Sequence, residues 1–188
     1  MVRAREEFIA AQPELDALKL VFVDETWAGL AMSRNYGWSP EGEDAVIHRQ
    51  IRGKKLSVIG AMAMDGERGL GFVEGGVNGE HFVAWIHEEL GPNLHEGDLV
   101  VMDNLRVHKM VAVREALESY GAKPLFLPAY SPELNPIELI WGAVKNVLRG
   151  MLPRYFDMVQ DVFREIWETL PSEVFARTVR HCGYAASC

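Results

Sequence analysis

The hydrophobic pattern alternates between short, nearly continuous apolar runs and longer segments whose apolar positions recur at helical spacing. The first run, KLVFVDET at residues 19–26, is apolar until it ends in acids, which is typical of a strand buried on both faces. Runs of the same kind recur at residues 97–104 and 123–128. We therefore predict three buried strands, two of which end close to a carboxylate, Asp24 or Asp103.

Two other segments, residues 54–66 and 68–76, meet at the dipeptide Asp65-Gly66 and predict an antiparallel hairpin. Helical spacing marks residues 78–90, 108–120, 136–152 and 156–170. Antiparallel strands followed by alternating strands and helices indicate an α/β fold, with a mixed sheet and helices on both faces. Residues 1–18 are expected to form a helical lead-in that packs loosely or belongs to a preceding region.

The composition suits one globular domain, because 48% of the 188 residues are hydrophobic and 24% are charged. No apolar run reaches the ~18–20 residues of a membrane span, and the N-terminus is too charged for a signal-peptide core. Cys182 and Cys188 lack metal-ligand spacing and are expected to be reduced thiols. We expect a cytoplasmic protein without a membrane partner.

The formal net charge of −8 argues against a simple nucleic-acid coat protein, because phosphate binding depends largely on Lys and Arg. Any contact with DNA must therefore be local. The best local candidate is the basic stretch HRQIRGKK, which contributes Arg49, Arg52, Lys54 and Lys55. A solvated loop is an equally good interpretation of this stretch.

The stretch YSPELNPIELIW, residues 130–141, combines a helix start with an acid. Its Asn-Pro dipeptide suits the cap and the first position of a helix. Glu138 follows in the first turn, on the flank of the apolar helix face, and a solvated glutamate is the simplest interpretation on the helix alone. Together with Asp24 and Asp103, however, Glu138 completes a set of three carboxylates. Carboxylate oxygens are the ligands that Mg²⁺ prefers, and ligand sites gather at strand ends in such sheets.

A family resemblance rests on three stretches of the sequence. These are VDET, VMDN with His108 shortly after it, and LPAYSPELNPIELIW. They contain all three acids, and 34 residues separate Asp103 from Glu138. Over residues 20–152 the chain resembles the DDE catalytic domain of the IS630-type insertion-sequence transposases, bacterial relatives of the Tc1/mariner superfamily. The interval of 34 residues is the spacing characteristic of that superfamily.

This resemblance implies an RNase H-like fold in which Asp24, Asp103 and Glu138 are the catalytic acids. In the family these acids bind two Mg²⁺ or Mn²⁺ ions. The ions serve hydrolytic cleavage at transposon ends and then attack of the freed 3′-hydroxyl on target DNA. The match also implies that three polar residues support the acids or position DNA, namely Asn104, His108 and Asn135. Helix-cap or turn roles are about equally good interpretations of these three.

The resemblance further implies that residues 1–18 are a helical connector from a DNA-binding region absent from this chain, and that residues 19–188 form the catalytic domain. The expected partners are double-stranded DNA, as transposon ends and as a target at TA steps, and a second copy of the chain on that DNA. The expected location is the bacterial cytoplasm, at the nucleoid when DNA is bound. No nucleotide cofactor is expected, because the glycines of GFVEGGVNGE lack a phosphate-binding pattern.

Two alternative functions stay open on the sequence. One is an RNase H-like DNA nuclease or resolvase that does not join ends. The other is a catalytically idle fragment that regulates a full-length transposase by dimerisation. Glu41 and Glu43 also stand where relatives of this kind often carry basic residues, so any DNA contact there is expected to be weakened.

Overall fold

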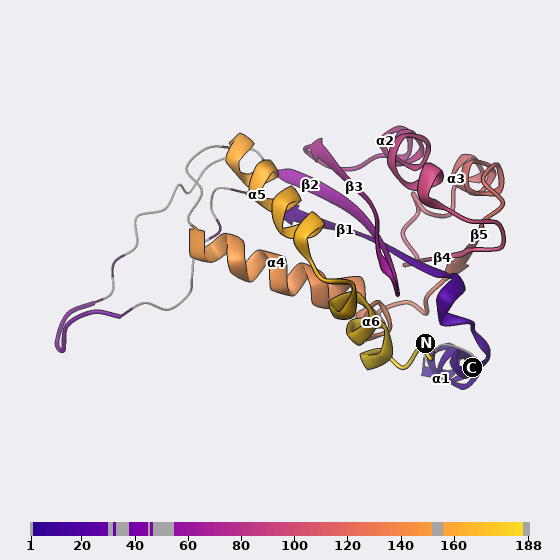
Figure 1. Ribbon diagram of the computed structural model, residues 1–188, viewed down its shortest axis with the longest axis horizontal. Helices are drawn as coiled ribbons and strands as arrows, with labels where there is room; N and C mark the ends of the chain where they lie inside the picture. The colour runs from indigo at the N-terminus through magenta and orange to yellow at the C-terminus, as the bar shows by residue number, and fades with distance from the viewer. Residues whose placement is uncertain are drawn as a thin grey trace.

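The residues that the structure describes form one five-stranded mixed sheet, in the order β3-β2-β1-β4-β5 (Figure 1). The computed structural model describes residues 2–29, 32, 38–44, 46, 55–151 and 156–185. The strands are β1 Leu20–Ala28, β2 Leu56–Ala63, β3 Gly66–Glu74, β4 Leu99–Met102 and β5 Lys123–Phe126. Pairing is antiparallel from β1 to β2 and from β2 to β3, and parallel from β1 to β4 and from β4 to β5. The predicted combination of a hairpin with parallel strands is confirmed.

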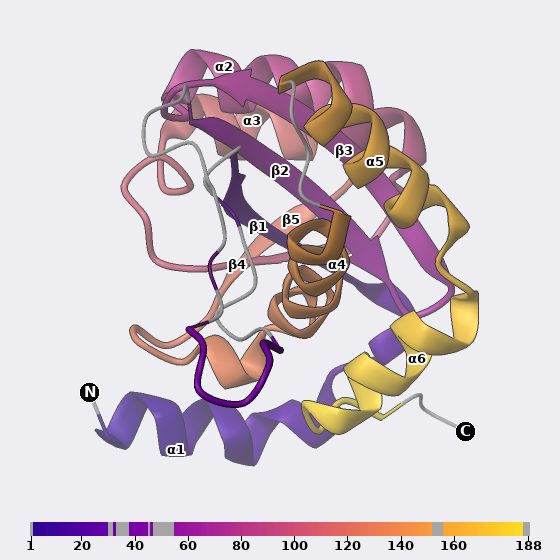
Figure 2. The ribbon, with the colours of Figure 1, turned by 90° about the vertical axis from the view of Figure 1, so that its left-hand side faces the viewer.

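Helices cover both faces of this sheet (Figure 2). The described helices are α1 Val2–Ala11, α2 Gly79–Trp85, α3 Val111–Glu118, α4 Ile137–Met151, α5 Phe156–Thr169 and α6 Ser172–His181. Short 3-10 helices occupy Gln12–Glu14, Ala17–Lys19, Gly91–Asn93 and Pro132–Leu134, and a π-helical turn extends α2 over Ile86–Leu90. Helices α4, α5 and α6 lie on one face, and α2 and α3 lie on the other.

The alternation of side chains along β1 divides the interior into two hydrophobic clusters. Phe22 joins the cluster that includes residues of α4, α5 and α6. Its neighbours Val21 and Val23 join the cluster formed with α2 and α3. Successive strand residues point to opposite faces, so one strand contributes to both cores and consecutive residues of β1 reach opposite sides of the sheet.

Three local predictions need correction. Asp24 is not at a strand end, because β1 continues through Ala28 along its partner β2, although the parallel pairing with β4 stops at Phe22. Helix α3 begins at Val111 instead of residue 108, because the preceding residues form turns. Helix α6 was not expected from the sequence at all. It packs against the cluster of the α4 face through Phe175 and its neighbours.

The N-terminal lead-in is exposed along most of α1, and a few specific contacts anchor it to the rest of the chain. The buried Gln12 donates a hydrogen bond from Nε2 to the carbonyl of Cys182 at 2.6 Å. Arg5 forms an ion pair of 2.8 Å with Glu133, in the turn before α4. Tyr184 also donates to the carbonyl of Leu134 at 2.8 Å. These contacts tie both ends of the described chain to the segment that leads into α4.

Cys182 is a free thiol buried near the end of α6, whereas Cys188 lies outside the described residues. Among the helices that the structure describes, none is both long enough and apolar enough to cross a membrane.

Candidate active site

A pocket of about 350 Å³ brings the three predicted acids together. Asp24, Asp103 and Glu138 line it, together with Asn104, Asn135 and the loop over residues 127–132. The acids come from a strand, a post-strand loop and a helix that are far apart in sequence. Their predicted convergence is therefore a property of the folded chain.

The sheet and α4 explain this convergence. Asp103 directly follows β4, and β4 runs parallel to β1, so Asp103 lies at the same edge as the part of β1 that carries Asp24. Glu138 lies in the first turn of α4, whose start is marked by a hydrogen bond from the Glu138 amide to the Asn135 carbonyl at 3.2 Å. Carboxylates on rigid elements need little reorganisation to act together.

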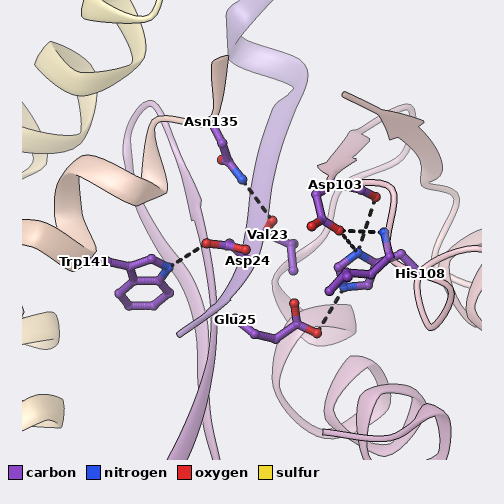
Figure 3. Close-up of polar contacts among 8 residues, drawn as sticks. Val23, Asp24, Glu25, Asp103, His108, Asn135 and Trp141 are labelled. Carbon is purple, nitrogen blue, oxygen red and sulfur yellow. Dashed lines mark hydrogen bonds and ion pairs between the residues drawn. The ribbon is translucent and has the colours of Figure 1, made fainter. Parts of the chain in front are cut away.

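Asn135 is anchored differently from the helix cap that its sequence suggests. Its Nδ2 donates to the carbonyl of Val23 at 3.3 Å, which ties the start of α4 to β1 beside Asp24 (Figure 3). Its Oδ1 is buried and has no hydrogen-bond partner among the described residues. Because Asn135 lines the pocket, that oxygen is a candidate acceptor for water or a ligand.

Asp24 is held from the α4 face of the sheet. The indole Nε1 of Trp141 donates to Asp24 Oδ2 at 3.1 Å, which leaves Oδ1 free of that contact (Figure 3). Burial, followed by the negative charges of Glu138 and Glu25, raises the pKa of Asp24 to about 8. At neutral pH the Asp24 carboxyl therefore binds a proton more readily than an ordinary aspartate does, and a nearby cation would favour its ionised form.

Asp103 is held from the opposite face. His108 donates from Nδ1 to Asp103 Oδ1 at 2.8 Å (Figure 3). The Leu105 amide donates to the same oxygen at 2.8 Å. Burial raises the pKa of Asp103, but these hydrogen bonds and the charge of His108 outweigh it, so the net pKa is lowered. Asp103 is thus ionised more readily than Asp24.

His108 is completely buried and lies between two carboxylates. Its Nε2 lies 3.1 Å from Glu25 Oε1, on the side opposite Asp103. Burial disfavours the charged imidazole, but the hydrogen bonds and charges of Asp103 and Glu25 prevail and raise the pKa of His108 to about 10. At neutral pH both ring nitrogens therefore carry a proton and both donate.

The remaining predicted residues divide into two groups. Asn104 lines the pocket and donates from Nδ2 to the carbonyl of Leu127, so it braces the pocket wall. Lys55 is exposed directly before β2 and does not line the pocket. The other members of the predicted DNA-binding stretch, Arg49, Arg52 and Lys54, lie outside the described residues.

Three residues at the site were not assigned these contacts from the sequence. The indole of Trp141 contacts Asp24, and the carboxylate of Glu25 contacts His108. Tyr130 is 89% exposed on the pocket wall and has a φ of 58°, which is unusual for a residue with a side chain. Strand alternation already indicated that Glu25 and Asp24 face opposite sides. The contact of Glu25 with His108, 83 residues away, could not be predicted from strand alternation.

The chemistry of the donor set fits a hard divalent cation. Three carboxylates line one pocket, and the pKa of Asp24 is raised first by burial and then by the charges of Glu138 and Glu25, which such a cation would offset. In the described part of the chain, no three His, Cys, Asp or Glu side chains are already grouped to hold a metal ion. Asp24, Asp103 and Glu138 are the residues of this pocket that could bind it, once their side chains are brought together around the ion.

The mixed sheet, with its helices on both faces and its acidic pocket, defines an RNase H-like fold. Residues 19–161 match the family model for the DDE superfamily endonucleases, and the chain therefore belongs to that family.

Similar proteins agree with this assignment. The transposable element Tcb2 transposase of Caenorhabditis briggsae is 29% identical over 72 residues, which are 38% of this chain and 26% of that protein. The Mos1 transposase paired-end complex with left transposon end has a TM-score of 0.80 at 19% identity, covering 96% of this chain and 57% of that one. The catalytic domain of Mos1 mariner transposase gives 0.73 at 17% identity, covering 96% and 85%. The resemblance to Tc1/mariner transposases is confirmed, and the chain spans a little over half of the Mos1 chain in the complex.

Proposed function

We propose that this chain is the catalytic domain of an IS630-type transposase, which cleaves DNA strands and transfers them during cut-and-paste transposition. The observation that carries the proposal is the pocket lined by Asp24, Asp103 and Glu138 in a chain of the DDE superfamily endonucleases. Asp24 lies in β1, Asp103 directly follows the neighbouring parallel strand β4, and Glu138 lies in the first turn of α4.

Asp24, Asp103 and Glu138 would hold two Mg²⁺ or Mn²⁺ ions. When bound, the ions would polarise the phosphate and lower the pKa of the attacking water or hydroxyl. Solved structures of the Mos1 mariner paired-end complex with Mn and with Mg support this choice of metals by analogy. Carboxylates, rather than His or Cys, suit these cations.

The chain's own residues position these ligands. Trp141 occupies one oxygen of Asp24, and His108 occupies one oxygen of Asp103, so each aspartate keeps a second oxygen for a cation. Asn104 and Asn135 hold the pocket wall and the start of α4 through backbone carbonyls. Their roles are therefore to fix the shape of the pocket around the scissile phosphate.

The proposed substrate is double-stranded DNA, first as transposon ends and then as a target at TA steps, and two copies of the chain would hold two ends. Arg49, Arg52, Lys54 and Lys55 are proposed to contact its phosphates. Lys145, on the helix that carries Glu138, places a further cation near the acids, with its Nζ 5.8 Å from the ring centre of Trp27. The relative solved as a complex with a left transposon end supports a DNA substrate.

The proposed organisation places a helical connector at residues 1–18 and the catalytic domain at residues 19–188. The connector would follow a separate region that recognises the transposon ends. The protein would act in the bacterial cytoplasm and associate with the nucleoid when it is bound to DNA.

The test is Mn²⁺-dependent cleavage and strand joining on a labelled, pre-nicked DNA end. We expect Asp103→Ala and Glu138→Gln to lower both activities at least about a thousandfold while leaving the protein folded. Glu67→Gln is the matched control, because Glu67 is an exposed strand glutamate that does not line the pocket.

Each other outcome selects a different function. Cleavage without joining would identify a nuclease or resolvase. An inactive wild type that lowers the activity of a full-length transposase would identify a regulatory fragment. Full activity in Glu138→Gln would remove Glu138 from the catalytic set.

A further inference from the structure

The loop that carries Asp103 has little regular backbone structure to fix it. Strand β4 ends at Met102 and α3 begins only at Val111, so local hydrogen bonds must set the direction of the Asp103 carboxylate. The side chain that does so is His108, whose ring is completely buried and lies 4.7 Å from the ring centre of Phe82. A ring held in this way can act as a rigid spacer.

The other ring nitrogen of His108, Nε2, contacts Glu25. Glu25 is consecutive with Asp24 in β1, and the alternation of the strand directs it to the opposite face. Its Oε1 lies 3.1 Å from His108 Nε2, its side chain is 14% exposed, and its Oε2 is buried without a hydrogen-bond partner among the described residues. Burying a carboxylate is costly, so this arrangement indicates a use for the charge.

We propose that Glu25 is a positioning residue that holds the His108 imidazole and, through it, one oxygen of Asp103, so that the other Asp103 oxygen faces a divalent cation. The two nitrogen–oxygen distances along this chain are 3.1 and 2.8 Å. The Leu105 amide completes the hold on Asp103 Oδ1. This inference rests on the proposed function, because it assumes that Asp103 is a metal ligand.

The arrangement also links the two catalytic aspartates mechanically. Asp24 and Glu25 are neighbours on one rigid strand, so the element that positions the first aspartate also positions the second through His108. Partners that orient a metal-binding side chain affect metal affinity even though they do not touch the metal. The prediction is therefore about Mn²⁺ affinity, measured without DNA.

The experiment is a double-mutant cycle read by calorimetric titration of Mn²⁺. Glu25→Gln removes the charge at nearly constant volume and should raise the Mn²⁺ dissociation constant about tenfold. His108→Asn keeps an amide N–H near the position of Nδ1, which can still donate to Asp103, but it cannot reach Glu25. In that background Glu25→Gln should change the Mn²⁺ dissociation constant less than about twofold.

The double-mutant cycle distinguishes a positioning role of Glu25 from a loss of folding and from a failure of the proposed function. Circular dichroism and urea denaturation establish that each variant is folded at the titration temperature, and Glu67→Gln serves as the charge-matched control. The inference would be overturned if Glu25→Gln weakened Mn²⁺ binding equally in the wild-type and His108→Asn backgrounds, or in neither. Mn²⁺ binding without DNA cleavage by the wild type would overturn only the proposed function, whereas the absence of Mn²⁺ binding would overturn both.

Discussion

The two faces of the sheet hold the two catalytic aspartates in different ways. On the α4 face, a neutral indole N–H from a fully buried tryptophan contacts Asp24. On the α3 face, a charged imidazole with its own counter-carboxylate contacts Asp103. The aspartate with the neutral partner has a raised pKa, and the one with the charged partner has a lowered pKa. The pocket thus pairs one acid that resists ionisation with one that ionises easily.

The difference has a structural origin. Trp141 is part of a helix packed into a large aromatic core, where it stacks on Trp167 with ring centres 4.9 Å apart. His108 belongs to a turn that is fixed mainly by its own polar contacts and by Phe82. We infer that the α4 face positions Asp24 by packing, whereas the α3 face positions Asp103 by hydrogen bonds.

The largest expected effect comes from removing the side chain of Trp141, which holds Asp24 by packing. Trp141→Ala should lower the free energy of unfolding by about 3–5 kcal/mol, because it leaves a cavity beside Trp167 and Phe163 and deletes the donor to Asp24. Urea denaturation measures the loss. Trp141→Phe should keep most of the stability while still lacking the N–H, and a Trp141→Ala variant as stable as wild type would contradict positioning by packing.

A smaller loss in the free energy of unfolding should follow from Gly60→Ala. Gly60 lies opposite Asp24 on β2, and a Cβ there would stand 2.4 Å from Trp141 Cη2, so the indole must move away. We expect a loss of about 1–3 kcal/mol in the free energy of unfolding, measured by thermal and urea denaturation.

The matched control is on the same helix as Trp141. Gly142 is exposed on α4 with no atom within 4 Å of an added Cβ, so Gly142→Ala should raise the free energy of unfolding by about 0.5–1 kcal/mol. Destabilisation of similar size in both variants would show that the contact of Gly60 with Trp141 is not the cause.

On the α3 face, Phe82→Leu should have a weaker effect. It removes the ring beside His108 but keeps an apolar side chain, so we expect a loss of about 1 kcal/mol in the free energy of unfolding. The Mn²⁺ dissociation constant should stay within about twofold of wild type, because the hydrogen bonds of His108 remain. A tenfold loss of Mn²⁺ affinity would instead assign the positioning of Asp103 to packing.

The smallest effect concerns Cys182, at the far end of the α4 face. Burial, and then the charge of Glu133, raises the pKa of this thiol to about 11 from a usual value of 9.0. Its thiolate is therefore scarcer in the folded protein than in the unfolded chain below pH 9, and alkylation at pH 8 should be about a hundredfold slower.

Iodoacetamide labelling in a Cys188→Ser background follows this single thiol. The rate should rise about tenfold per pH unit until the pH approaches 11, because the thiolate is the reactive form. Labelling of the folded protein at the rate of the urea-unfolded chain would contradict close packing at this end of the face.

The outline of the fold and the acids of the site could be predicted because their signals are local. Apolar runs and helical spacing identified the strands and most helices. The sheet brings Asp24, inside β1, close to Asp103, which directly follows the parallel neighbour β4. Helix α6 was missed because its mostly polar sequence is held by tertiary contacts, including those of the adjoining Tyr184 with Leu134. The partners of Trp141 and Glu25 were missed because each lies on a distant segment.

The central claim is that Asp24, Asp103 and Glu138 hold divalent cations. Anomalous diffraction from crystals soaked in Mn²⁺ tests it most directly, because the scattering locates the ions without reference to activity. We predict ions within coordination distance, about 2.1 Å, of oxygens from these carboxylates, with Trp141 and His108 still on the other aspartate oxygens. Ions bound only elsewhere, or none in the pocket at a saturating Mn²⁺ concentration, would contradict the account.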